Sequence, residues 1–557
     1  MSNRFRHGIA LVLILGTLVL AGCQSPRDEA KVLRLNLGGE PQTLDPQRAA
    51  DSTSISVLRS LYASLLRVGP DLSIQPDLAA EVPTVANGGI SADGLTYTFR
   101  LRAGLTWSDG TPLHASAFVD GARRLFEPAN ANPYVDFYRV IAAQGANDRV
   151  AQALAEGRTG ADLEALQRTA ARDLEVSAPD DRTVVYRLSR RSPAFLSLVT
   201  LSPMYPVRAD LIAQHGDRWT DAGRLVTNGP FTLATWDHGR QIVLARNARY
   251  HGGVVPLDGV RLDMIEDAAI ALLAYQKGEL DVVTLGPAEL VQVRGTQSLR
   301  DQFQSYAQLS TQALYFNAAD PLFRDARVRR ALSLALDRPG YAEVLREGAV
   351  LPATAWLPPG MPGHDRAAGT DAAQPAVERA QALLRDAGHE GGRGVEVQLL
   401  VADASSARTT AQWLKEQWER ALGVRVTLVV RERAAYFADR VGGKFQVLVG
   451  GWSADYADPE NWLPQFRSGS ALNPGRFSDA AYDRLIDQAT VELDQSRRIA
   501  TYQQAQRVLI EQAAIAPLAY GRRNILVQPW VRNLVTSPME SEVPGDLYLD
   551  RASIAQR

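Results

Sequence analysis

Hydrophobic and polar positions divide this chain into short strands and amphipathic helices. Residues 95–101 are apolar at every second position, which predicts a strand with one buried face. Residues 375–387 begin with a proline and are followed by a glycine, as a helix would be. The near-continuous apolar runs 395–401 and 424–430 predict buried strands on either side of a helix over 408–422. This order favours an open α/β sheet, whose ligands tend to lie at strand ends.

Helical spacing also predicts a helix over 55–66, with apolar residues on one face. A second apolar run, 445–449, contains no charge and predicts another buried strand. Gly450 and Gly451 then allow the chain to turn and permit close approach of another group.

Binding chemistry follows these glycines. Trp452 and Asp455 come next, and a desolvated carboxylate beside aromatic side chains needs a cationic partner, which a bound ammonium would supply. The alternative interpretation is a strand end with a capping aspartate and a core tryptophan. These residues alone do not decide between the two.

The composition is that of a soluble globular protein. The chain has 557 residues, of which 46% are hydrophobic and 22% are charged, and it is long enough for two to four domains. Its formal net charge of −2 argues against a binder of nucleic acid or another polyanion. After the N-terminus, no segment reaches the ~18 uninterrupted apolar residues of a membrane span.

The N-terminus has the pattern of a secretory leader. Arg4 and Arg6 precede an apolar run over 9–21, and Leu-Ala-Gly-Cys ends at Cys23. The run is short for a span, so an uncleaved anchor helix is the less favoured alternative. Leu-Ala-Gly-Cys resembles the bacterial lipobox, which implies that a signal peptide, 1–22, is removed and that Cys23 is lipidated. Acyl chains there would anchor the protein to a membrane outside the cytoplasm.

Motifs for catalysis and metal binding are missing from the sequence. Cys23 is the only cysteine, so we expect no internal disulfide and no thiol catalyst. The seven histidines are scattered and form no metal-binding motif. Gly443-Lys444 continues with phenylalanine, unlike a phosphate-binding loop, and the segment from Gly451 to Asp455 lacks the last glycine of a hydrolase elbow. We therefore expect a binding protein without a cofactor rather than an enzyme.

Several motifs, in the right order, match one family. They are Leu44-Asp45-Pro46, Trp107-Ser108-Asp109-Gly110-Thr111-Pro112, Thr227-Asn228-Gly229-Pro230-Phe231, Phe323-Arg324-Asp325-Ala326-Arg327-Val328-Arg329-Arg330-Ala331-Leu332 and Gly451-Trp452-Ser453-Ala454-Asp455-Tyr456. On these motifs the chain resembles the family 5 extracellular solute-binding proteins of peptide ABC importers, and most closely their oligopeptide-binding branch. The arginines of the fourth motif are expected on a solvated helix face.

The resemblance implies the class II periplasmic-binding-protein fold, an α/β architecture of three lobes with mixed sheets and a two-strand hinge between lobes. Lobe I would comprise residues 23–62, 207–308 and 525–557. Lobe II would be 63–206, and lobe III 309–524. A ligand would close the lobes because it contacts both sides only in the closed form.

The resemblance also implies a binding site. In the family, the aspartate that matches Asp455 pairs with the α-ammonium of a peptide, and the main chain before it pairs with the peptide backbone as an added strand. Aromatic side chains would form the walls, and Arg440 would face the C-terminal end of the ligand. The predicted ligand-binding residues are Asp455, Trp452, Gly450, Gly451, Ser453, Arg440, Tyr134 and Phe137.

Three positions depart from the oligopeptide-binding branch. Val449 stands where arginine is common, Ala50 stands where an acid contacting the ligand is expected, and a histidine near 405–408 is missing. Peptide length and C-terminal preference therefore stay open. We predict a monomeric, membrane-anchored receptor that passes short peptides to the permease subunits of an ABC importer. The alternatives are a murein peptide, nickel complex, haem or oligosaccharide as ligand, or a chaperone or signalling role.

Overall fold

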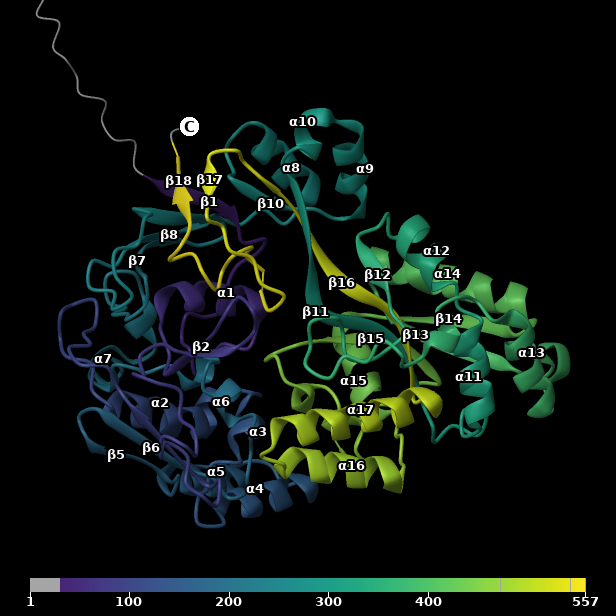
Figure 1. Ribbon diagram of the computed structural model, residues 1–557, viewed down its shortest axis with the longest axis horizontal. Helices are drawn as coiled ribbons and strands as arrows, with labels where there is room; N and C mark the ends of the chain where they lie inside the picture. The colour runs from purple at the N-terminus through teal and green to yellow at the C-terminus, as the bar shows by residue number, and fades with distance from the viewer. Residues whose placement is uncertain (1–30, 471, 541, 556–557) are drawn as a thin grey trace, which may run out of the picture.

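One large mixed sheet runs through the computed structural model, which describes residues 31–470, 472–540 and 542–555 (Figure 1). The predicted signal peptide and Cys23 lie outside the described residues. The strands of this sheet are β1 (Val32–Asn36), β7 (Phe231–Asp237), β8 (Gln241–Arg246), β9 (Gly259–Asp263), β10 (Val282–Thr284), β11 (Phe303–Phe316), β12 (Val350–Pro352), β13 (Glu396–Ala402), β14 (Arg425–Arg431), β15 (Val447–Ser453) and β16 (Ile515–Val527). Their order is β14-β13-β15-β11-β16-β10-β1-β9-β8-β7, with β12 paired to β16.

Two long strands, β11 and β16, join the two halves of this sheet. They pair antiparallel from Phe303 opposite Leu526 to Tyr315 opposite Ile515. On its outer side β11 pairs with β15, whereas β16 pairs with β10. In Figure 1 the two strands run together from the upper part of the molecule into the lobe at the right. Their ladder shifts register twice, and such irregularities bend and twist a sheet.

The lobe at the right in Figure 1 has helices on both faces of its strands. Adjacent residues of β13 face opposite sides, so Leu399 packs in one core and Leu400 in the other. The first core includes α11 (Ala326–Leu334), α13 (Val377–Asp386) and α14 (Ser405–Leu422). The second includes α15 (Arg433–Gly442), α16 (Ala480–Val491) and α17 (Gln495–Glu511). The predicted inward residue Trp418 is fully buried, and Gly423 ends α14 in a left-handed conformation, as expected.

Most of the rest of the chain forms the left side of Figure 1 around a shared hydrophobic core, whereas residues 271–299 pack in a separate core at the top. A small sheet in the order β4 (Thr96–Arg100), β6 (Thr183–Arg187), β5 (Val176–Asp180) lies at the lower left, and β2 (Leu66–Val68) pairs with β3 (Ile74–Pro76). A last pair joins β17 (Val531–Arg532) and β18 (Ser553–Ile554). The other helices are α1 (Ser52–Leu61), α2 (Ser116–Phe126), α3 (Val135–Tyr138), α4 (Ala146–Ala155), α5 (Ala161–Arg172), α6 (Phe195–Leu198), α7 (Ala209–His215), α8 (Ala268–Gln276), α9 (Pro287–Gly295), α10 (Gln297–Arg300) and α12 (Arg338–Gly340).

Two local predictions were wrong. The helix predicted over 55–66 ends at Leu61, where Tyr62 turns to an extended conformation. The backbone of Gly229 packs against this point, and a Cβ there would lie 2.6 Å from the main chain of Leu61. The predicted turn at Gly450 and Gly451 is also absent, because β15 continues through both glycines to Ser453.

Candidate functional site

A cavity of about 510 Å³ lies between segments that are far apart in the sequence. Its walls come from residues 50–68, 200–205, 308–310, 453–455 and 538–550, among others. These segments belong to both sides of the paired strands β11 and β16, so the cavity lies between the lobes. Its volume is in the range of sites that bind small molecules.

Asp455 lies in the wall of this cavity, two residues after β15. The Tyr134 hydroxyl donates a hydrogen bond to its Oδ1 over 2.8 Å, and the Asn461 side-chain amide donates to its Oδ2 over 2.9 Å. Asn461 in turn accepts from the main-chain N–H of Asp455 at 2.9 Å and from the indole of Trp452 at 3.2 Å. The carboxylate is therefore held in one orientation by neutral donors.

The charge of Asp455 has no cationic partner in the part of the chain that the structure describes. Among the described residues, no arginine, lysine or histidine forms an ion pair with this carboxylate. Burial raises the pKa of Asp455, and the hydrogen bonds from Asn461 and Tyr134 oppose that rise. Burial, together with the charge of Asp455, raises the pKa of Tyr134, so its hydroxyl remains a donor. A positive group entering the cavity would find a desolvated, oriented anion without a counter-ion.

Tyr134 and Phe137 join the far side of the cavity to the segment after β15. Tyr134 directly precedes α3 and Phe137 lies within it, and their rings are 5.6 Å apart. Phe137 also meets Tyr456 edge to face, with ring centroids 6.0 Å apart. In Figure 1, α3 lies where the lower-left lobe meets the lobe at the right. The two lobes thus make a hydrogen bond at Asp455 and an aromatic contact at the next residue, Tyr456.

The structure brings three of the predicted residues to the cavity and leaves the others outside its wall. Tyr134, Ser453 and Asp455 line it. Those that do not are Gly450, Gly451, Trp452, Phe137 and Arg440. Arg440 lies on α15 with its guanidinium 5.5 Å from the ring centre of Tyr315.

The β15 edge beside the glycines is open on one side. β11 pairs with all of β15, from Val447 to Ser453. The ladder between β15 and β13 ends at Leu448, so within the described residues Gly450–Ser453 has no strand partner on that side. An exposed strand edge can accept an extended peptide.

Most of the charged residues in the cavity wall were not predicted from the sequence. The guanidinium groups come from Arg59, Arg67 and Arg523, and the additional carboxylates from Asp77, Glu540, Glu542, Asp546 and Asp550. Four of these five acids lie within eleven residues near the C-terminus, in a segment with little regular structure. That acidic spacing was the one signal in the sequence that could have drawn attention to them.

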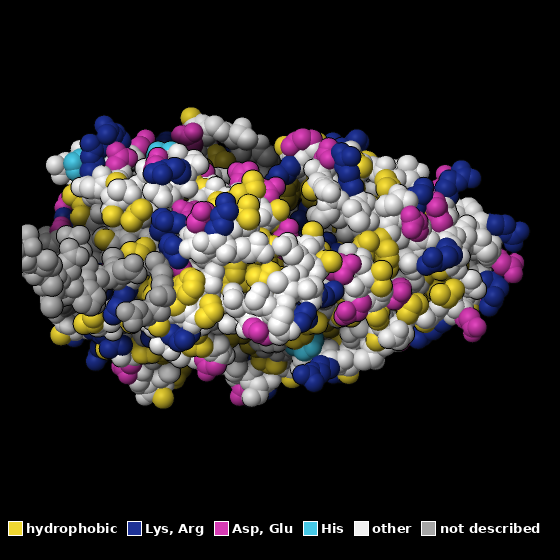
Figure 2. Space-filling view, turned by 90° about the horizontal axis from the view of Figure 1, so that it is seen from above, with side chains coloured by type: hydrophobic (Ala, Val, Ile, Leu, Met, Phe, Trp, Pro, Cys, Tyr) yellow, Lys and Arg dark blue, Asp and Glu magenta, His cyan; other side chains and the backbone are white. Residues whose placement is uncertain are grey.

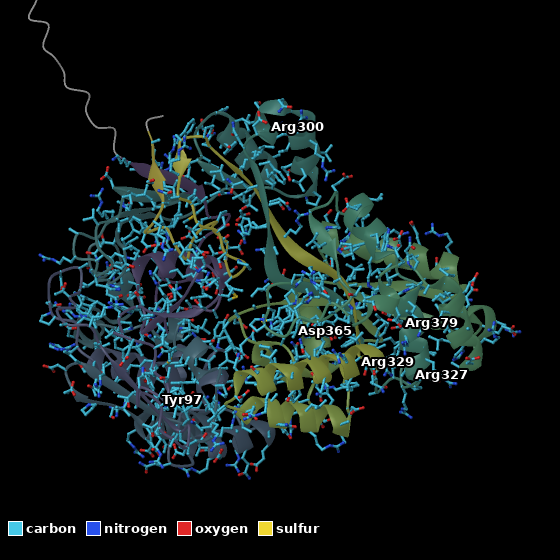
Figure 3. The ribbon with its side chains drawn as sticks, viewed as in Figure 1. Tyr97, Arg300, Arg327, Arg329, Asp365 and Arg379 are labelled. Atoms are coloured by element: carbon cyan, nitrogen blue, oxygen red, sulfur yellow. The ribbon has the colours of Figure 1, made fainter. Side chains whose placement is uncertain are left out.

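The arginines of α11 lie away from the cavity. In Figure 3, Arg327 and Arg329 sit in the lobe at the right, whereas Tyr97 marks the lobe at the lower left. The prediction of a solvated face was wrong for Arg329, which is 4% exposed and donates to the main-chain oxygens of Phe323 and Ala513. These bonds tie α11 to the end of α17 and so stabilise the lobe.

Three further observations concern the described residues. They contain no group of three or more His, Cys, Asp or Glu side chains able to hold a metal ion. No helix in that part of the chain is both long and apolar enough to cross a membrane. On the face seen in Figure 2, basic and acidic side chains are interspersed rather than gathered into a patch of one sign.

Comparison with known proteins finds relatives that match almost the whole chain. The family model for bacterial extracellular solute-binding proteins, family 5, matches residues 73–474. The probable deoxycholate-binding periplasmic protein YgiS of Escherichia coli is 30% identical over 530 residues, which cover 94% of this chain and 95% of that protein. The periplasmic oligopeptide-binding protein OppA of E. coli is 28% identical over 557 residues, covering 97% of each chain.

Solved structures show the same architecture. The E. coli murein tripeptide-binding protein MppA superposes with a TM-score of 0.75 at 27% identity, covering 95% of this chain and 99% of that one. OppA of Burkholderia pseudomallei gives a TM-score of 0.74 at 25% identity, covering 95% and 100%. This likeness confirms the fold class predicted from the sequence.

Proposed function

Because this chain belongs to the family 5 bacterial extracellular solute-binding proteins, we propose that it captures short peptides between its lobes and delivers them to the permease of an ABC importer. The named relatives include periplasmic binding proteins for oligopeptides and for murein peptide. The family is one of binding proteins, and the reaction proposed here is capture and release rather than catalysis.

One observation carries the peptide proposal: an oriented, buried carboxylate lines an interlobe cavity and forms no ion pair with the described residues. An ionised carboxylate can accept about four hydrogen bonds. Asp455 can therefore bind the free amino terminus of a peptide, an ammonium ion, while Tyr134 and Asn461 keep their bonds. A charge-assisted hydrogen bond in a desolvated site is stronger than one in water. Binding an amino terminus here would supply the counter-ion that the protein lacks.

The neighbouring strand edge supports the same ligand. A peptide whose amino terminus lies at Asp455 could extend along Gly450–Ser453, on the side of β15 that β13 leaves open. Main-chain pairing of this kind is independent of side chains, which suits a receptor for peptides of varied sequence. The side chains of Trp452 and Phe137 would then help to hold Asp455 and its neighbours in position rather than contact the ligand.

Closure of the lobes would follow from contacts that the ligand makes on both sides. We assign residues 23–62, 207–308 and 525–557 to lobe I, 63–206 to lobe II and 309–524 to lobe III. Tyr134 and Asp455 then belong to different lobes, and an ammonium bound between them favours the closed form by its differential affinity. The paired strands β11 and β16 would act as the hinge.

The location of the receptor follows from the N-terminal pattern. We propose that the leader 1–22 is removed and that acyl chains on Cys23 hold a monomer at a membrane surface outside the cytoplasm.

A thermal-shift experiment tests the peptide proposal. The protein is refolded from denaturant to remove co-purified ligand and is then mixed with trialanine or its N-acetylated twin. Trialanine at 100 times its Kd should stabilise the fold by about 2.7 kcal/mol, and the acetylated peptide at the same concentration should have little effect. Deoxycholate serves as a third ligand. Equal shifts for the two peptides, or a shift with deoxycholate alone, would contradict the proposal.

A further inference from the structure

The cavity wall carries more negative than positive charge. Six carboxylates line it against three guanidinium groups. The carboxylates belong to Asp77, Asp455, Glu540, Glu542, Asp546 and Asp550. A ligand that binds here moves from water into a cavity with an excess of negative charge, and such a cavity favours positively charged ligand groups.

Each of the three guanidinium groups lies close to a carboxylate or a main-chain oxygen of the protein. Arg59 donates to both oxygens of Asp546, at 3.0 and 3.2 Å. Arg523 donates to the main-chain oxygen of Glu542 at 2.6 Å. Arg67 lies 3.7 Å from Asp550. A carboxylate on the ligand would therefore compete with existing partners for every cation of the cavity wall.

The carboxylates of Asp77 and Asp550 are less well balanced. Asp77 is 7% exposed, and its side chain accepts hydrogen bonds from the main-chain N–H of Ser64 at 3.2 Å and interacts with Nε2 of His251 at 2.8 Å. Asp550 accepts a long 3.4 Å hydrogen bond from Tyr250, and its ion pair with Arg67 is also long. Asp77 therefore has His251 as its partner, and among the described residues Asp550 has only the distant Arg67 as an ion-pair partner.

The polar atoms around this pair are not all satisfied. Nδ1 of His251 is buried without a hydrogen-bond partner within the described residues, and it can accept a hydrogen bond when Nε2 donates to Asp77. Burial raises the pKa of Asp550, Arg67 opposes the rise, and the nearby charge of Asp77 adds to it. This part of the wall is built from polar groups that remain incompletely paired in the protein alone.

We propose that a second positive group of the ligand, the side chain of a lysine or arginine in the peptide, binds at Asp77 and Asp550 while the amino terminus binds at Asp455. This inference rests on the proposed function and adds the ligand class, which is peptides of net positive charge. All three carboxylates line the same cavity, so one ligand can contact them together. The basic side chain would reduce the repulsion between Asp77 and Asp550 and supply donors to the weakly paired Asp550.

Calorimetry with matched tripeptides tests the inference. The set contains alanine tripeptides with one lysine at position 1, 2 or 3, and the same peptides with norleucine or glutamate in place of lysine. Norleucine keeps the aliphatic stem and removes the charge. At one or more positions, the lysine peptide should bind at least about tenfold more tightly than its norleucine twin, and the glutamate peptide should bind most weakly.

Variants of the cavity wall test whether Asp77 and Asp550 cause the preference for lysine peptides. Asp550→Asn and Asp77→Asn should each reduce the ratio of norleucine to lysine Kd values relative to the wild type. Two variants are used because Asp77 also holds His251 and could be needed for folding. Asp487→Asn is the matched control, since Asp487 pairs with Arg467 at an exposed site, and it should leave the ratio unchanged.

The outcomes separate this inference from the proposed function. If lysine gives no advantage at any position, or if Asp550→Asn keeps the full advantage, the second cationic site is wrong while peptide capture stands. If no tripeptide with a free amino terminus binds, both the proposed function and this inference are wrong.

Discussion

Replacing Asp455 by asparagine removes one negative charge from the interlobe cavity at almost constant side-chain size. In the structure this carboxylate accepts one hydrogen bond from Tyr134 and one from Asn461. Asparagine can accept only one of the two, and its own amide then faces a donor. A neutral hydrogen bond is worth about 1 kcal/mol, and removing a charge that burial disfavours offsets this loss. Thermal stability without ligand should therefore change little.

The effect on peptide binding should be much larger. Truncating one partner of a buried, hydrogen-bonded charge pair costs about 2–5 kcal/mol. Taking about 3 kcal/mol for the contact between Asp455 and the ammonium, the Kd of a free peptide should rise by about two orders of magnitude. The N-acetylated peptide has no charge to lose, so its weak binding should be the same in both proteins.

A double-mutant cycle by isothermal titration calorimetry isolates this contact. The four Kd values are those of wild type and Asp455→Asn, each with free and acetylated peptide. We expect a coupling free energy of at least about 2 kcal/mol. A wild-type preference for the free peptide that survives unchanged in the variant would refute the reasoning, because another group would then bind the amino terminus.

Three further substitutions test the structure around the cavity. Tyr134→Phe removes the interlobe hydrogen bond and should weaken free-peptide binding about fivefold in calorimetry. The control variant Tyr138→Phe loses a hydrogen bond to Leu198 within one lobe and should change thermal stability but not peptide binding. Equal effects of the two variants on peptide binding would contradict the role of Tyr134. Burial, together with Asp458, raises the pKa of Glu460 to about 7. The folded state therefore binds more protons than the unfolded state between about pH 4.5 and 7, and its unfolding free energy falls as the pH rises through that window, by up to about 3 kcal/mol from this group. Glu460→Gln should flatten that dependence in urea unfolding at pH 5 and 8, and an unchanged slope would be inconsistent with the raised pKa. Gly451→Ala places a Cβ 2.6 Å from a main-chain oxygen of β11 and should cost about 1–3 kcal/mol in the same assay, while Gly295→Ala, at an open helix position, should be tolerated.

Much of the fold follows from local patterns. The helix predicted over 408–422 is α14, extended by three residues at its start, and the flanking apolar runs are β13 and β14. These segments are long or strongly apolar, so burial alone decides their structure. A glycine residue does not determine its local structure in this way. At Gly451 the missing side chain serves close packing between β15 and β11, and the sequence alone does not distinguish that use from a turn.

The candidate site was predictable only where it coincides with a motif. Asp455 follows an apolar strand and two glycines, and its neighbours drew attention to it. Asn461, which orients its carboxylate, lies six residues further on in a loop that no periodicity describes. The acids of 538–550 reach the cavity through tertiary packing of a segment with almost no regular structure. Local patterns do not encode such long-range proximity.

Mass spectrometry of the ligand released from natively purified protein tests the central claim most directly, because it assumes nothing about what is bound. The account predicts short peptides with free amino termini, enriched in lysine and arginine. A bile acid, a metal complex or peptides with blocked amino termini as the dominant ligand would contradict it.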